Sequence, residues 1–116
     1  MPKIIYVSHP FGGKGENFID ARSICRRLAK QLPEALFLPG LSVPCRNYSK
    51  KHYSRDLTLL LELESRCDVV YMAGKWEAST RCVAEYEYAK RNGIPVAESY
   101  AELLAILVSM DREELQ

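Results

Sequence analysis

Four short apolar runs, each separated from the next by a longer segment with helical spacing, constrain the fold of this chain most strongly. The run DVVYMAG is almost entirely apolar, as expected for a strand that is buried on both faces at the centre of a sheet. Strands that alternate with helices are typical of βαβ units, in which the strands are parallel. The four predicted strands are KIIYVSH (3–9), EALFLPG (34–40), DVVYMAG (68–74) and IPVAES (94–99).

The segments between these runs predict four helices. The first has apolar residues at helical spacing from Ala21 to Leu32, with Asn17 as its expected N-cap and Pro33 as its end. The other three are predicted at 51–66, 79–92 and 100–115. We therefore expect one α/β domain over residues 1–116, built as a three-layer, flavodoxin-like parallel sheet of four to five strands.

Composition excludes several classes of protein. The net charge of +1 predicts no general binding to nucleic acid or to acidic membranes. The chain has no run of about 18 apolar residues that could span a membrane, and its N-terminal apolar run is too short for a secretory signal. The four cysteines form no CxxC pair. We therefore expect a cytoplasmic protein with reduced thiols and without a zinc site or a disulfide framework.

In a parallel sheet, ligands bind outside the carboxyl ends of the strands, near the point where the strand order reverses. That edge would gather the segments SHPFGGKGEN (8–17), 39–50 and GKWEAST (74–80). A strand order of 2-1-3-4 would also place Tyr6 of the first strand beside the helix predicted at 79–92. The segment 46–55 mixes basic and aromatic residues, and we expect a solvated loop there rather than a surface for single-stranded nucleic acid.

Two glutamates of the helix at 79–92 differ in their expected environment. Cys82, Val83, Tyr86 and Ala89 share the apolar side of this helix; Glu87 lies away from it, whereas Glu85 lies at its border. A carboxylate at the edge of a core is costly unless it is used or paired. Glu85 is therefore either a functional group or a half-buried partner of Arg81 or of a tyrosine.

Other candidates also have a simple structural explanation. Asp56 is either a ligand group or an early-turn aspartate that favours the helix dipole. Ser79 is most simply a helix N-cap, although a cap at a helix start can also bind phosphate. Trp76 would lie at the ligand edge, where it could stack on a base or cover a neighbouring subunit. Gly12 and Gly13 suit a loop whose backbone N–H groups contact a ligand, but turn geometry explains them as well. His9 and His52 lack a third ligand, so we expect no metal and no other cofactor.

Three segments in order resemble the nucleoside 2-deoxyribosyltransferase superfamily over residues 3–97. They are IIYVSHPFGG (4–13), YSRDLTLLLELESRCDVVYM (53–72) and GKWEASTRCVAEYEYAKRNGIPV (74–96). The chain is also similar to the deoxynucleoside-monophosphate N-glycosidases. The resemblance implies a glutamate nucleophile at Glu85, positioned by Tyr6, and a base ligand or proton donor at Asp56. It further implies substrate contacts at Ser8, Gly12, Gly13 and Ser79, and relatives that complete their site with a neighbouring subunit.

The expected activity is cleavage or transfer at the N-glycosidic bond of a (deoxy)nucleoside or nucleotide, by a homo-oligomer. One departure is Arg81, where related chains commonly have glycine; it would fill the pocket or add a phosphate ligand. The alternatives are an NAD-glycohydrolase-like enzyme and a non-catalytic nucleotide-binding or interaction protein. An enzyme needs Glu85 in an open cleft near Tyr6, whereas a binding protein tolerates a Glu85 that Arg81 closes off.

Overall fold

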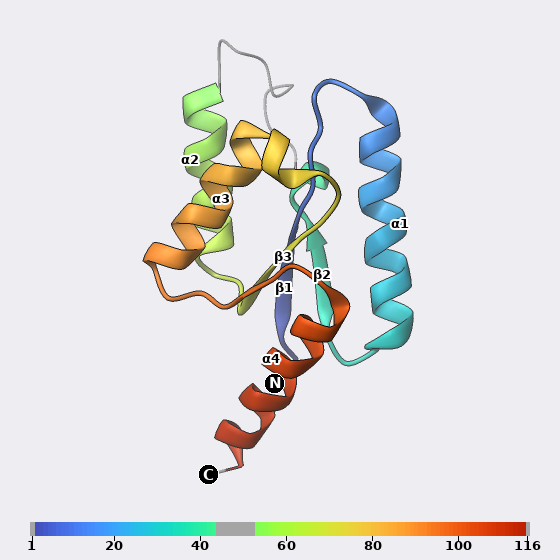
Figure 1. The fold of residues 1–116 in the computed structure, drawn as a ribbon, viewed down its shortest axis with the longest axis vertical. Helices are drawn as coiled ribbons and strands as arrows, with labels where there is room; N and C mark the ends of the chain where they lie inside the picture. The colour runs from blue at the N-terminus through green and yellow to red at the C-terminus, as the bar shows by residue number, and fades with distance from the viewer. Residues whose placement is uncertain (1, 44–52, 116) are drawn as a thin grey trace.

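The computed structural model describes residues 2–43 and 53–115. In these segments four parallel strands form one sheet in the order β2-β1-β3-β4 (Figure 1). This order confirms the predicted α/β class and the central place of the third strand, because β3 pairs with β1 on one side and with β4 on the other. The strands are β1 (Ile4–Ser8), β2 (Leu36–Pro39), β3 (Val69–Met72) and β4 (Val96–Ala97).

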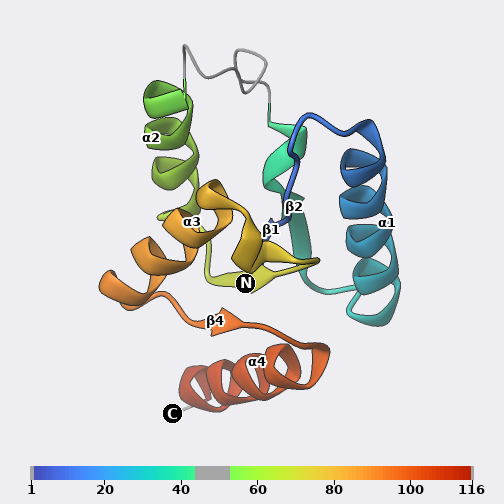
Figure 2. The same cartoon turned by 45° about the horizontal axis from the view of Figure 1, so that its top comes forward.

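Helices cover both faces of the sheet and make the fold three-layered. In Figures 1 and 2, α1 lies on one side of the strands, and α2 and α3 lie together on the other. One core cluster joins β1 and β3 to α1 and α4, and a second joins them to α2 and α3. The helices are α1 (Gly15–Gln31), α2 (Tyr53–Glu64), α3 (Thr80–Arg91) and α4 (Tyr100–Glu114), with short 3₁₀ turns at η1 (Gly40–Ser42) and η3 (Trp76–Ala78).

Successive side chains of β1 point to opposite faces of the sheet, and this alternation decides which of them contact α3. Ile5 and Val7 belong to the core on the side of α1 and α4. Tyr6 belongs to the core on the side of α2 and α3, and Ser8 bonds to a side chain of α3. Side chains of a strand alternate between faces, so the sequence IIYVS directs two hydroxyl groups toward α3. All four of these residues are fully buried.

Two local predictions need correction. Asn17 is not the N-cap of α1, because the helix begins at Gly15 with Lys14 as its N-cap. The side chain of Asn17 instead donates a hydrogen bond to the carbonyl oxygen of Phe11, which fastens the glycine loop to the helix. Most of the basic and aromatic segment at 46–55 lies outside the described residues. None of the helices in the described segments is long and apolar enough to cross a membrane.

Candidate functional site

Glu85 lies at the centre of the buried face of α3, not at its border. The buried residues of this helix are Arg81, Cys82, Glu85 and Ala89, and Glu85 is 0% exposed. Val83, expected on the apolar side, is only half-buried, and Glu87 is exposed as predicted. The helix is therefore rotated slightly from the orientation that the apolar residues alone suggest, and this rotation directs the Glu85 carboxylate toward β1.

Three donors converge on the Glu85 carboxylate. The Tyr6 hydroxyl donates to Oε2 at 2.5 Å, and the Ser8 hydroxyl donates to Oε1 at 2.7 Å. Arg81 Nη1 also donates to Oε1, at 2.8 Å. Donors to a carboxylate favour its charged form, and two of these come from a strand whose position the sheet fixes. The site thus holds the Glu85 carboxylate in one orientation.

Tyr6 is within hydrogen-bond reach of Glu85, as the strand order predicted. Burial, and next the Glu85 charge, raise the pKa of Tyr6 well above its ordinary value of 10, so the phenol keeps its proton and acts only as a donor. Ser8, for which the resemblance implies a substrate contact, is the last residue of β1. It is fully buried, and its hydroxyl donates to Glu85.

The Arg81 side chain covers the Glu85 carboxylate. Its Nη2 donates to the carbonyl oxygen of His9 at 2.5 Å while Nη1 bonds to Glu85, so the guanidinium bridges the β1–α1 loop and α3. The open cleft at Glu85 that an enzyme needs is therefore absent from this conformation. Glu85 is therefore bonded at the same time to both of the partners that the sequence suggested as alternatives, Arg81 and a tyrosine.

A pocket of about 220 Å³ lies directly beyond Arg81. Asp56 is 2% exposed, and its Oδ2 has no hydrogen-bond partner among the described residues, while Oδ1 lies 3.3 Å from Nη2 of Arg55. Gly12 and Gly13 have φ of 57° and 74°, which glycine adopts without strain. The lining residues are Phe11, Gly12, Gly13, Tyr53, Asp56, Leu57, Ser79 and Arg81. The pocket thus collects most of the site residues predicted from the sequence.

A more open hollow of about 650 Å³ adjoins the pocket and shares Gly12 and Ser79 with it. Lys14 and Lys75 line it, and buried His9 contacts Asp20 there, with 2.6 Å between Nε2 and Oδ2. Ser79 caps α3, because its hydroxyl accepts from the Cys82 N–H at 3.2 Å, and so confirms the simpler explanation for this residue. The start of α3 and two lysines make this hollow suitable for an anionic group.

Trp76 is not part of either hollow. Its ring stacks on Tyr86, with 4.8 Å between the centroids, in the core on the side of α2 and α3. A base would have to displace Tyr86 to use the stacking face of Trp76 that Tyr86 covers. Trp76 therefore packs on Tyr86 in this structure, and its contact with a base or a neighbouring subunit stays a prediction.

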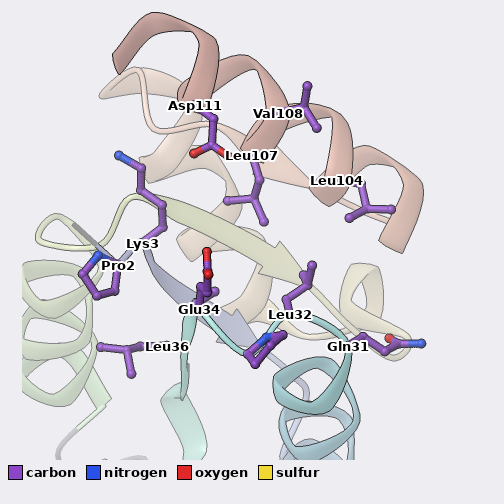
Figure 3. Close-up of a pocket in the computed structure, with 12 residues that line it drawn as sticks. Pro2, Lys3, Gln31, Leu32, Glu34, Leu36, Leu104, Leu107, Val108 and Asp111 are labelled. Carbon is purple, nitrogen blue, oxygen red and sulfur yellow. The ribbon is translucent and has the colours of Figure 1, made fainter. Parts of the chain in front are cut away.

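A larger hollow, about 840 Å³, lies elsewhere, between α4 and the start of β2 (Figure 3). It is at the amino ends of the strands, opposite to the edge where Glu85 lies. Leu104 and Leu107 of α4 face Leu32 and Leu36 across it, and its charged lining residues are Lys3, Glu34 and Asp111. This composition suits packing against another surface better than chemistry.

Sequence analysis missed two residues that shape the site. Glu64 of α2 is 0% exposed, and neither of its oxygens has a hydrogen-bond partner in the described segments. Its spacing could have revealed it, because Asp56, Leu60 and Glu64 recur at i, i+4 and i+8 and all three are buried. The second is Gly40, where a Cβ atom would lie 2.7 Å from Cζ of Tyr6 and closer still to its hydroxyl.

We expect Gly40→Ala to displace the Tyr6 hydroxyl from Glu85 and to lower the free energy of unfolding by about 1–3 kcal/mol, as overpacking does. Gly15→Ala is the matched control, since a Cβ there meets nothing within 4 Å. Urea unfolding should show the loss for Gly40→Ala only, and a smaller loss in a Tyr6→Phe background because the hydroxyl is gone. Equal losses in both backgrounds would show that the loss does not come from contact with the Tyr6 hydroxyl.

A family model described as "Domain of unknown function (DUF4406)" matches residues 3–98. This range includes β1, the glycine loop, α2 and α3, and so the whole of the site around Glu85. No curated protein and no solved structure shows a significant match to the chain. No group of three or more potential metal-ligating side chains occurs within residues 2–43 and 53–115.

Proposed function

The chain belongs to the DUF4406 family, and from its site we propose that it cleaves or transfers at the N-glycosidic bond of a nucleoside or nucleotide, with Glu85 as nucleophile. One observation carries the proposal. The buried Glu85 carboxylate accepts hydrogen bonds from the hydroxyl groups of Tyr6 and Ser8, and it lies directly behind a pocket at the carboxyl edge of the sheet. Three buried polar groups converging there are costly for a merely structural core, which supports a functional role.

The chemistry fits these groups. Breaking an N-glycosidic bond builds positive charge on the sugar, and a fixed carboxylate can stabilise or trap it, as in glycoside hydrolysis. The departing base leaves more easily when it is protonated. Asp56 lines the pocket, and one of its oxygens has no partner among the described residues, so it is the candidate group that contacts the base. Tyr6 and Ser8 hold Glu85 and do not need to reach the substrate.

Arg81 must leave Glu85 before any sugar can approach, and we propose that a phosphate of the substrate draws it away. A guanidinium binds phosphate through two parallel hydrogen bonds, a geometry that compensates for the lost carboxylate. The neighbouring hollow contains Lys14, Lys75 and Ser79 and could hold the same phosphate. A nucleoside monophosphate is therefore a better substrate than the nucleoside under this proposal.

A second candidate is a nucleotide-binding protein without catalysis. The observation that favours it is the bond between Arg81 and a Glu85 that is 0% exposed. A site of this kind would bind a nucleotide in the pocket of about 220 Å³ and never open further. The two candidates share the pocket and differ in whether Glu85 is ever exposed to the ligand.

Incubation of the protein with nucleosides, nucleoside monophosphates and NAD, followed by chromatography for free base, tests the proposal. We expect base release from at least one monophosphate, and a loss of at least about 10³-fold in Glu85→Gln because the nucleophile is gone. Glu87→Gln is the matched control, since Glu87 is exposed two residues along the same helix, and it should retain full activity. Release of base from NAD alone would favour the NAD-glycohydrolase alternative.

Equal losses in the two variants, or full activity in Glu85→Gln, would disprove the assignment of the nucleophile. No base release from any compound, together with binding of a nucleotide that Arg81→Ala abolishes, would favour the binding protein.

Free, buried thiols at Cys25, Cys67 and Cys82 suit the reducing cytoplasm, where we propose that this reaction takes place.

We also propose that the chain forms a homo-oligomer through α4 and β2. Leu36 is 58% exposed and Val108 is 48% exposed on either side of the apolar hollow in Figure 3, and β2 is an edge strand. Exposed apolar surface beside an open strand edge favours association. Sedimentation should show more than one chain per particle at micromolar concentration, and Val108→Lys should give the monomer. A monomeric wild-type protein would contradict this.

A further inference from the structure

His9 is a buried imidazole that the proposed reaction leaves without a role. It directly follows β1 and is 3% exposed, so its ring lies at the carboxyl edge of the sheet. Gly74, whose φ is 64°, packs against the ring, and a Cβ atom there would lie 3.1 Å from Nε2 of His9. Both residues line the hollow of about 650 Å³. The Nε2 edge of the ring therefore faces this hollow.

Both ring nitrogens of His9 meet groups that only accept hydrogen bonds. Nδ1 lies 2.8 Å from the carbonyl oxygen of Pro10, and Nε2 lies 2.6 Å from Oδ2 of Asp20. A carbonyl oxygen and a carboxylate have no hydrogen to donate, and a neutral imidazole has only one N–H. Both contacts are hydrogen bonds when the ring carries two N–H groups, as an imidazolium beside the carboxylate of Asp20.

Asp20 contributes little as a purely structural partner of His9. Its side chain is 58% exposed on α1, and an ion pair with an exposed member stabilises a fold only weakly. Among the described residues that line the hollow, Asp20 is the only acidic one, and Lys14 and Lys75 are there as cations. Its Oδ2 atom thus lies where an oxygen of a bound anion would accept the Nε2–H of His9.

We propose that Nε2 of His9 binds the phosphate group of the substrate and that Asp20 takes the place of this phosphate in the present conformation. The inference rests on the proposed function for the identity of the substrate. A phosphate group carries more negative charge than a carboxylate and has three acceptor oxygens, so it can contact His9 and the two lysines together. Asp20 then turns outward into solvent, which its exposure allows.

His9 also connects this hollow with Arg81. The His9 carbonyl oxygen accepts Nη2 of Arg81, whose Nη1 bonds to Glu85. The hollow and the pocket that Arg81 lines share Gly12 and Ser79. Phosphate bound at the ring of His9 therefore lies next to the guanidinium that must leave Glu85 before a sugar can approach.

Isothermal titration calorimetry with inorganic phosphate, at pH 7 and constant ionic strength, tests this site. Asp20→Ala should bind phosphate about tenfold more tightly because the competing carboxylate is gone, and His9→Asn about tenfold more weakly. Asparagine can keep an N–H near the position of Nδ1 but has none at the position of Nε2. Glu16→Ala removes an exposed carboxylate from the first turn of α1. As the matched control, it should change the affinity by less than about twofold.

The double variant His9→Asn/Asp20→Ala separates competition for Nε2 from simple repulsion between Asp20 and phosphate. If Asp20 competes for Nε2, most of the gain from Asp20→Ala should vanish in the His9→Asn background. The same gain in both backgrounds would overturn the proposal, because the removal of a negative charge alone would explain it. Absence of phosphate binding by both the wild-type protein and Asp20→Ala would also overturn it.

The contact can be tested without a substitution at His9, should His9→Asn not fold. The chain has two histidines, so His52→Gln leaves a single imidazole for ¹⁵N NMR. Inorganic phosphate should shift the Nε2 signal of His9 and leave that of Nδ1, which is bonded to Pro10, nearly unchanged. An Nε2 signal that stays in place while phosphate binds would overturn the proposal.

The outcomes for phosphate binding and for base release are independent of each other. The predicted phosphate affinities without base release from any compound would support the phosphate site and contradict the proposed function. Base release from a monophosphate, with a phosphate affinity that neither Asp20→Ala nor His9→Asn changes, would overturn the phosphate site and leave Glu85 as the nucleophile.

Discussion

Glu64→Leu is expected to stabilise the fold by about 3 kcal/mol at pH 7, an unusually large gain for one substitution. The carboxyl group of Glu64 has a pKa of about 9 in the folded protein, against an ordinary value of 4.5. The unfolded chain therefore loses this proton at pH 7 and the folded chain does not, which disfavours folding. Leucine has a similar size, and its introduction sacrifices no hydrogen bond to the described residues, because the Glu64 carboxyl oxygens make none with them.

The sign of the pH dependence follows from the raised pKa. Below pH 4.5 both states keep the proton, and the ionisation of Glu64 costs nothing; from there to pH 9 each pH unit lowers the stability of the wild-type fold. The gain from Glu64→Leu should therefore be smallest near pH 4 and largest near pH 9. Urea unfolding at several pH values measures it, with exposed Glu62→Leu as control. A gain that does not grow with pH would contradict a protonated Glu64.

Arg81→Gly should lower the stability of the fold and raise the rate of base release. The variant removes one partner of a buried ion pair, which costs about 3 kcal/mol or more. It also joins the pocket to Glu85, because Arg81 both lines the pocket and bonds to the carboxylate. Glu85 keeps the hydroxyl groups of Tyr6 and Ser8, so its orientation survives. Base release should rise at least tenfold, which corresponds to about 1.4 kcal/mol in the barrier.

The same variant tests whether Arg81 binds phosphate. If it does, the ratio of monophosphate to nucleoside turnover should fall in Arg81→Gly, since the nucleoside no longer needs a phosphate to open the site. Arg91→Gly, an exposed arginine at the other end of α3, is the matched control and should change neither stability nor turnover by much. An unchanged ratio would show that Arg81 is no phosphate ligand.

The order of the elements and the meeting of Tyr6 with Glu85 were predictable because they depend on local patterns. Apolar runs and helical spacing identify strands and helices. The connections between parallel strands are right-handed, which leaves few possible strand orders. Once β1 lies beside β3, the alternation of IIYVS places Tyr6 and Ser8 on the face of α3. Ser79 was likewise predictable as a cap from its position before a helix.

The closure of the site by Arg81 and the burial of Glu64 were not predictable, because both depend on how α2 and α3 pack. A helical wheel gives the direction of a side chain only approximately. It therefore placed Glu85 at the border of the apolar side of the helix instead of at the centre of the buried face. Whether an arginine at i−4 bonds to such a glutamate depends on its rotamer, which tertiary contacts select. The need for glycine at position 40 arises from contact with Tyr6, far away in sequence.

Mass spectrometry of acid-quenched protein tests the role of Glu85 most directly. Arg81→Gly, in which the site is open, is mixed with a nucleoside monophosphate, quenched during turnover and digested. The account predicts that the peptide containing Glu85 gains the mass of the sugar phosphate, and that Arg81→Gly/Glu85→Gln shows no such gain. Rapid release of base with no adduct on any peptide, or with an adduct on a residue other than Glu85, would contradict it.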